Sequence, residues 1–172
     1  MLTEKLKAAL TSYPDFPSKG ILFRDINSIF LNIDLFDELI EEMAKIPYMS
    51  EADGIVAIDA RGFIFGSILA NKLKKRLVLA RKKGKLPGDI VEKSYDLEYG
   101  SDSLAIQKSA LKNIKKVVII DDLLATGGTA KCVADLLLSE EKEILSLIVV
   151  IELFSLKGRK KLPFPVYSQL QY

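Results

Sequence analysis

A buried strand that ends on two acids constrains the fold of this 172-residue chain more than any other stretch. Residues 117–120 read Val-Val-Ile-Ile, a β-branched apolar run typical of a strand buried on both faces of a parallel sheet. Asp121 and Asp122 follow directly, at the carboxyl end of the strand, where ligands bind in open α/β sheets. The stretch therefore predicts an α/β fold with a binding site at this edge of the sheet.

A turn of small residues follows these acids and leads into a helical pattern from about residue 130 to 138. The turn consists of Ala125, Thr126, Gly127, Gly128 and Thr129. Its small residues let successive backbone N–H groups point inward, which forms an anion nest backed by a helix N-terminus. The chain contains neither the P-loop pattern with its lysine nor G-x-G-x-x-G, so the nest is of another kind.

Acids beside a phosphate nest suit a ligand that offers both hydroxyls and a phosphate, as a ribose 5-phosphate does. The nest and the hydroxyls of Thr126 and Thr129 would hold the phosphate. The carboxylates of Asp121 and Asp122 would accept hydrogen bonds from the ribose hydroxyls. The alternative is a polar turn before a capped helix, with no ligand. That alternative leaves two buried carboxylates without a partner, which costs free energy.

The composition excludes several classes of chemistry. The chain has no histidine, which excludes histidine acid–base catalysis, histidine-containing triads and the usual zinc sites. Carboxylates and cations must then carry the chemistry. Cys132 is the only cysteine, so no intramolecular disulfide forms and a reducing compartment is expected. With 49% hydrophobic residues, a net charge of +2 and no membrane-length apolar run, one α/β domain of residues 1–172 in the cytoplasm is expected.

A second strand-to-helix turn predicts another anion site. Residues 54–58 form an apolar run that ends at Asp59, and a helical pattern covers about residues 63–74. Arg61 and Gly62 fall at the turn between these elements, where backbone N–H groups face an anion. A surface ion pair is the alternative role for Arg61.

A long polar segment follows the third predicted strand, residues 77–80. It runs from about residue 81 to 101 and opens with the basic residues Arg81, Lys82, Lys83 and Lys85. Structureless segments of this length inside compact domains are usually lids or disordered. The sequence therefore predicts a flexible lid loop.

The other elements are predicted to form the scaffold. The periodicity predicts amphipathic helices over residues 3–12 and 33–44, and strands over residues 21–23 and 144–153. Asn32 or Asp34 is expected to cap the second helix. Together the patterns predict a mostly parallel sheet flanked by helices on both faces.

Four stretches of the chain resemble a known family. The strand, acid pair and A-T-G-G-T turn resemble the phosphoribosyl diphosphate signature of type I phosphoribosyltransferases. Residues 20–26, 60–66 and 81–100 narrow the resemblance to the adenine phosphoribosyltransferases. The resemblance implies transfer of the 5-phosphoribosyl group from phosphoribosyl diphosphate to adenine, which gives AMP and pyrophosphate in purine salvage. It also implies the type I fold, with a small N-terminal hood at about residues 13–30 and the lid at about residues 81–101.

The same resemblance assigns phosphoribosyl diphosphate to a set of residues. The set comprises the acid pair, the A-T-G-G-T turn, Arg61, Arg81, Lys82 and Lys85. Arg61 is implied to bind the pyrophosphate directly, in a loop that in the family often carries a strained peptide just before the arginine, here Asp59–Ala60. Mg²⁺ is implied as a cofactor that the substrate carries, without a protein metal site. A homodimer that binds neither nucleic acid nor membrane is also implied.

The remaining roles concern the base. Glu98 is implied as the catalytic carboxylate near the imidazole edge of adenine, although the residues alone do not select it over other acids of the lid. Phe23 and Leu123 are implied to cover the two faces of adenine, and the backbone of Leu22 and Arg24 to read its edge. From the sequence alone, a core position for Phe23 is an equal alternative.

Two other functions fit parts of the sequence. A 6-oxo purine would need a donor facing its oxygen, and neither Leu123, Leu124 nor Lys131 supplies an obvious one after the acid pair. A regulator that senses phosphoribosyl diphosphate and binds DNA or RNA would need a DNA-binding segment or a basic face. The residues before Tyr13 are too few for a winged helix, so adenine transfer is the favoured function.

Overall fold

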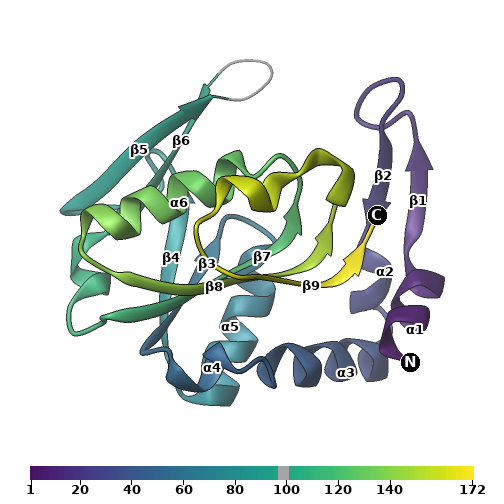
Figure 1. Ribbon diagram of the computed structural model, residues 1–172, viewed down its shortest axis with the longest axis horizontal. Helices are drawn as coiled ribbons and strands as arrows, with labels where there is room; N and C mark the ends of the chain where they lie inside the picture. The colour runs from purple at the N-terminus through teal and green to yellow at the C-terminus, as the bar shows by residue number, and fades with distance from the viewer. Residues whose placement is uncertain (97–100) are drawn as a thin grey trace. The chain divides into compact units, whose positions relative to one another are not determined.

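The computed structural model describes residues 1–96 and 101–172 (Figure 1). The chain divides into two compact units, Met1–Met43 and Ala44–Tyr172, and each is described by itself below. No helix within the described residues is both long and apolar enough to span a membrane.

The first unit combines short helices with a two-stranded hairpin. Its elements are α1 (Leu2–Ala9), β1 (Thr11–Pro14), β2 (Leu22–Asp25), α2 (Asn27–Phe30) and α3 (Ile33–Ala44). The two strands pair antiparallel, with Tyr13 opposite Phe23. The ring of Phe23 packs edge-on against Phe16, with 5.1 Å between the ring centroids.

The prediction for the start of this unit was partly wrong. A helix over residues 3–12 was predicted, but Leu10 is extended and the next four residues pair with β2. Pairing with a partner about a dozen residues away overrides the local helical pattern. The capping prediction for α3 is confirmed, because the Leu35 N–H donates to Oδ1 of Asn32 at 3.1 Å.

A seven-stranded sheet forms the second unit. Its strands are β3 (Gly54–Ile58), β4 (Arg76–Lys82), β5 (Ile90–Asp96), β6 (Ser101–Gln107), β7 (Lys116–Leu124), β8 (Glu143–Glu152) and β9 (Val166–Gln171). They lie in the order β5-β6-β4-β3-β7-β8-β9, and the five strands from β4 to β9 are mutually parallel. The strands β5 and β6 join the edge antiparallel. The predicted mostly parallel sheet is confirmed.

Helices cover both faces of this sheet. The two long ones are α5 (Gly62–Leu73) and α6 (Gly128–Ser139), and the short helices are α4 (Tyr48–Glu51), η1 (Lys108–Leu111), η2 (Phe154–Leu156) and η3 (Gly158–Lys161). Figure 1 shows α6 lying across one face. Val56 and Ile58 share a buried cluster with residues of α6 such as Val133, whereas Ala57 touches α5 at Gly66. Because side chains alternate along a strand, α5 and α6 lie on opposite faces.

The predicted lid segment is largely an ordered hairpin, which corrects the prediction of one loop from residue 81 to 101. Arg81 and Lys82 are the last residues of β4, and β5 and β6 pair from Ile90–Gln107 to Asp96–Ser101. The strand β5 also packs on α6. The sequence predicted a loop here because the segment is rich in polar residues, most of which lie on one face of the hairpin. A loop of residues 83–89 remains between β4 and β5.

Candidate functional site

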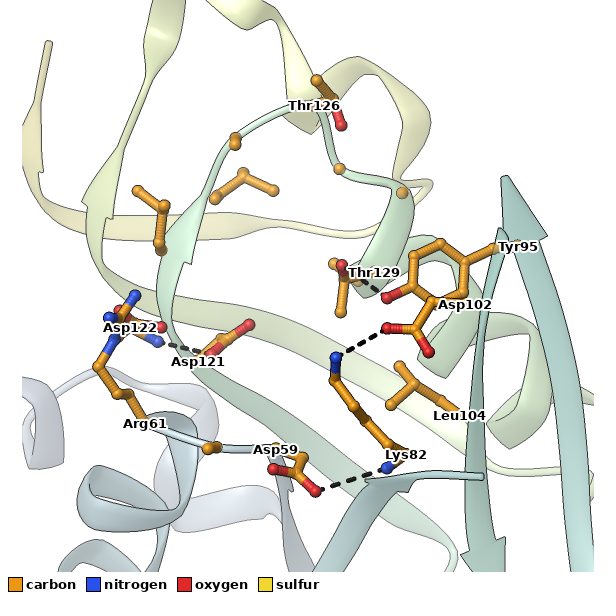
Figure 2. A pocket seen from close by; sticks show the side chains of 17 residues that line it. Asp59, Arg61, Lys82, Tyr95, Asp102, Leu104, Asp121, Asp122, Thr126 and Thr129 are labelled. Carbon is orange, nitrogen blue, oxygen red and sulfur yellow. Dashed lines mark hydrogen bonds and ion pairs between the residues drawn. The ribbon is translucent and has the colours of Figure 1, made fainter. Parts of the chain in front are cut away.

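A cavity of about 420 Å³ opens at the carboxyl ends of β3 and β7 within the second unit (Figure 2). Its lining comprises Asp59, Ala60, Arg61, Lys82, Tyr95, Asp102, Leu104, Asp121, Asp122, Leu123, Leu124, Ala125, Thr126, Gly127, Gly128, Thr129 and Ala130. Four separate stretches therefore meet here: the turn before α5, the end of β4, the β5–β6 hairpin and the loop between β7 and α6. Ligands bind at this edge in open parallel sheets.

The acid pair lies at one side of the cavity. The backbone N–H of Asp122 donates to Oδ1 of Asp121 at 2.8 Å, and Nε of Arg61 lies 2.5 Å from Oδ2 of Asp122. Burial raises the pKa of Asp121 well above its usual range, and the charge of Asp122 raises it further. Two acids therefore share one arginine here, and the charged form of Asp121 is disfavoured unless a ligand brings hydroxyl donors or a cation.

The turn between β7 and α6 is held in shape by a close approach of two backbones. Gly127 has φ +81°, and a Cβ there would lie 2.6 Å from the carbonyl oxygen of Gly158. A Cβ on Gly158 would in turn collide with the carbonyl oxygen of Ala125. Only glycine fits at both positions. The turn can therefore present its N–H groups at the N-terminus of α6, the arrangement that binds phosphate.

Cations line the turn before α5 and the end of β4. Arg61 precedes α5, and the peptide bond between Asp59 and Ala60 is cis. Nε of Arg81 lies 3.3 Å from Oδ2 of Asp59, and its guanidinium lies 5.8 Å from the ring centroid of Phe63. Nζ of Lys82 lies 3.0 Å from Oδ2 of Asp102. Each of these three cations therefore contacts a carboxylate of its own chain.

The hairpin adds three residues that the sequence did not predict for the site. Tyr95 lies directly opposite Asp102 in the β5–β6 pairing, and Leu104 is two residues further along β6. All three share one face of the hairpin and line the cavity (Figure 2). The hydroxyl of Thr129 donates to the Tyr95 hydroxyl at 3.3 Å. The sequence signal for β6 was the short apolar run Leu104, Ala105 and Ile106 in an otherwise polar segment, which a loop assignment passes over.

The structure brings together most of the predicted phosphoribosyl diphosphate residues. Arg61, Lys82, the acid pair and the A-T-G-G-T turn line one cavity, as does Leu123. Arg81 and Lys85 do not line it; Nη1 of Arg81 donates to the Lys85 carbonyl oxygen at 3.3 Å. Their role with the substrate stays a prediction.

Most of the residues predicted to contact adenine lie outside the second unit, which contains the cavity. Leu22, Phe23 and Arg24 lie on β2 of the first unit, so their role toward adenine also stays a prediction. Glu98 lies outside the described residues.

Known proteins resemble this chain along its whole length. Residues 26–168 match the family defined by the phosphoribosyl transferase domain. The chain belongs to this family. A relative from Prochlorococcus marinus, named adenine phosphoribosyltransferase, is 58% identical over 170 residues, which cover 99% of each chain.

Solved structures of the family superpose closely on the chain. The adenine phosphoribosyltransferase of Thermoanaerobacter pseudethanolicus matches with a TM-score of 0.93 and 43% identity over 99% of each chain. The enzyme of Saccharomyces cerevisiae, solved with adenine and an imino-altritol bisphosphate, matches with a TM-score of 0.86 and 41% identity over 98% of each chain. The predicted family and the type I phosphoribosyltransferase fold are both confirmed.

Proposed function

We propose that this phosphoribosyltransferase transfers the 5-phosphoribosyl group from phosphoribosyl diphosphate to adenine, producing AMP and pyrophosphate. The observation that carries the proposal is that one cavity is lined both by the acid pair and by the A-T-G-G-T turn, called the phosphate turn below. The relatives named adenine phosphoribosyltransferase, and the yeast enzyme solved with adenine, support adenine as the base. The reaction belongs to purine salvage.

The ribose 5-phosphate occupies the part of the cavity formed by β7 and α6. Its phosphate accepts hydrogen bonds from the N–H groups of the turn and from Thr126 and Thr129, where the α6 N-terminus favours negative charge. The carboxylates of Asp121 and Asp122 accept hydrogen bonds from the ribose hydroxyls. Hydroxyl donors add to the partners that Arg61 and the Asp122 N–H already give the acid pair.

The chemical step breaks the bond between the ribose anomeric carbon and the diphosphate oxygen, and forms a bond from that carbon to a ring nitrogen of adenine. Negative charge develops on the departing pyrophosphate. Arg61 and Lys82 stabilise this charge, because both cations face the cavity. Glu98 accepts the proton that the ring nitrogen loses. Exclusion of water protects the ribosyl cation from hydrolysis.

The proposed adenine contacts are Leu123, near the end of β7, and Leu22, Phe23 and Arg24 of β2. Leu123 lines the cavity and offers an apolar surface to one face of the base. In this proposal Phe23 covers the other face, and the backbone groups of Leu22 and Arg24 pair with the exocyclic amine and the neighbouring ring nitrogen. Phe23 is held by its edge-on contact with Phe16.

Mg²⁺ is part of the proposed reaction. Within the described residues, no group of three or more acidic, Cys or His side chains is placed to hold a metal ion. A cation that takes most of its oxygen ligands from the substrate would favour the charged form of Asp121, whose pKa is raised by burial. Mg²⁺ bound in this way neutralises charge on the leaving group.

A cytoplasmic homodimer is the proposed working form. The apolar side chains of Ile64 and Ile68 lie one turn apart on α5 and are 39% and 37% exposed. Exposed apolar residues on a helix of this kind favour a subunit interface. Sedimentation that detects only monomer at assay concentrations would contradict the dimer.

The test is the release of pyrophosphate when phosphoribosyl diphosphate, Mg²⁺ and one purine base are supplied. We expect turnover with adenine and little with hypoxanthine, guanine or xanthine. Turnover only with a 6-oxo purine would overturn the base assignment, and no turnover with any base would overturn the reaction.

The proton acceptor has its own test. Glu98→Ala is expected to lower kcat by about 10²–10³, the usual effect of removing one such group, with little change in diphosphate binding. Glu92→Ala is the matched control, because Glu92 is an acid of β5 that pairs with Lys83 and does not line the cavity. Normal turnover of the Glu98 variant would remove Glu98 from the mechanism.

A further inference from the structure

An ion pair spans the cavity wall between β4 and the hairpin. Nζ of Lys82 lies 3.0 Å from Oδ2 of Asp102, and both side chains line the cavity. Lys82 occupies the last position of β4, and Asp102 lies near the start of β6. Figure 2 shows the two side chains pointing toward each other across from the acid pair.

The carboxylate of Asp102 is oriented by its own backbone. Its Oδ1 accepts a hydrogen bond from the N–H of Ser103 at 2.8 Å, which leaves Oδ2 for Lys82. Its place opposite Tyr95 sets it on the face of the hairpin that forms the cavity. The hydrogen bond from Lys82 holds the pKa of Asp102 below its usual range. Asp102 is therefore a fixed negative charge inside a cavity that receives an anion.

This inference rests on the proposed function, in which Lys82 stabilises the departing pyrophosphate. A carboxylate on Lys82 opposes that role in two ways. It shares the ammonium group with the pyrophosphate, and it repels the pyrophosphate directly, because like charges at such distances disfavour each other. We propose that Asp102 is a positioning residue that keeps Lys82 at the cavity and competes with pyrophosphate for it, so that the product is bound loosely and leaves.

Loose binding of a product has a kinetic benefit. An interaction that holds the transition state and the product equally well slows product release, and product release limits turnover in many enzymes. Asp102 takes over Lys82 when the pyrophosphate leaves, so the ammonium group is never left unpaired. The side chain of Lys82 is 59% exposed, so the competition is moderate, in the range of an exposed ion pair.

The experiment measures pyrophosphate binding to Asp102→Asn by calorimetry in the presence of Mg²⁺. Asparagine keeps the size of the side chain and its acceptor oxygen but removes the charge. We expect the pyrophosphate Kd to fall about two- to fivefold, the range of an exposed ion pair. The KM for phosphoribosyl diphosphate should fall in parallel, while kcat stays equal or decreases.

Glu92→Gln is the matched control. It removes the same charge from the same hairpin, and Glu92 pairs with Lys83 at 3.0 Å without lining the cavity. The pyrophosphate Kd of this variant should equal that of the wild type. Tighter binding in both variants would show a general charge effect and would overturn the proposal, as would unchanged or weaker binding in Asp102→Asn.

A second comparison separates competition for Lys82 from direct repulsion of the pyrophosphate. In a Lys82→Met background, the further change Asp102→Asn should tighten pyrophosphate less than it does with Lys82 present. An equal effect in both backgrounds would overturn the competition for Lys82. Turnover of the wild type with adenine is measured first, so a failure of the proposed reaction is distinguished from a failure of this inference.

Discussion

Asp121 and Glu152 lie near the carboxyl ends of two neighbouring parallel strands, β7 and β8, yet their surroundings are opposite. Glu152 is fully buried and its carboxylate is bound by its own chain: Nε of Arg159 donates at 2.6 Å and the hydroxyl of Ser168 at 3.0 Å. The hydrogen bonds from Arg159 lower the pKa of Glu152. Burial raises the pKa of Asp121, beside a second acid.

We interpret Glu152 as a structural carboxylate and Asp121 as a candidate ligand-binding carboxylate. Among the described residues, the side-chain partners of the Glu152 carboxylate lie on η3 and β9, so this acid fastens the C-terminal segment to the sheet. Asp121 receives one backbone hydrogen bond and faces the cavity. An acid with a strongly raised pKa at the edge of a cavity is a candidate ligand contact.

The first prediction has the largest effect and concerns activity. Asp121→Asn should lower kcat/KM for phosphoribosyl diphosphate by about 10²–10³, because a charged partner of the ribose hydroxyls or the cation is lost. The same variant should also raise the free energy of unfolding, because it removes a carboxyl group whose charged form is disfavoured by burial. Urea denaturation and steady-state kinetics measure the two effects. A variant that is both less stable and fully active would refute the functional role of Asp121.

The second prediction is the converse change at Glu152. Glu152→Gln should lower the free energy of unfolding by about 1–3 kcal/mol, because it weakens charge-assisted hydrogen bonds from Arg159 and Ser168. The kinetic constants of the folded variant should stay close to those of the wild type. A large loss of kcat without loss of stability would show that Glu152 acts in the reaction and would end the distinction from Asp121.

The third prediction concerns the contact of Gly158 in η3 with the turn between β7 and α6. Gly158→Ala places a Cβ against the carbonyl oxygen of Ala125 and should displace the phosphate turn. Overpacking of this kind costs about 1–3 kcal/mol, so the KM for phosphoribosyl diphosphate should rise along with the loss of stability. Gly84→Ala is the control, because a Cβ there has no neighbour within 4 Å, although its φ of +77° adds local strain. An unchanged KM in Gly158→Ala would show that substrate binding by the turn does not depend on its contact with Gly158.

The fourth prediction uses pH and has the smallest effect. The pKa of folded Glu152 lies below its ordinary value of 4.5, so its stabilisation is present above that value and is lost as pH falls through the folded pKa. Folded Asp121 has a pKa above its ordinary 3.8, so it destabilises the fold as pH rises through the raised pKa. Between about pH 4 and 7, the free energy of unfolding of the wild type should therefore rise relative to that of Asp121→Asn as the pH falls. The wild type should be more stable than Glu152→Gln near neutral pH, and this difference in the free energy of unfolding should shrink only below the ordinary Glu pKa of 4.5. Equal pH profiles of the two variants would refute the contrast.

Local patterns predicted much of the scaffold and the centre of the site. The apolar runs of β3 and β7, the acids that end them and the turns before α5 and α6 are contiguous in sequence, so their joint position at one sheet edge follows from topology. The hairpin was missed because its strands are stabilised by pairing with each other and with β4 and α6 rather than by local pattern.

The sequence by itself determined the family, and its apolar runs and small-residue motif predicted the mostly parallel sheet and the turn before α6, because these signals are local patterns. Only the tertiary structure decided that Asp102 meets Lys82 and that Gly158 supports the turn at Gly127. These contacts join residues some 20 to 30 positions apart, through strand register and backbone approach that no local preference encodes. The same reason explains why Asp121 and Glu152, both acids after apolar runs, serve different ends: their partners come from distant segments.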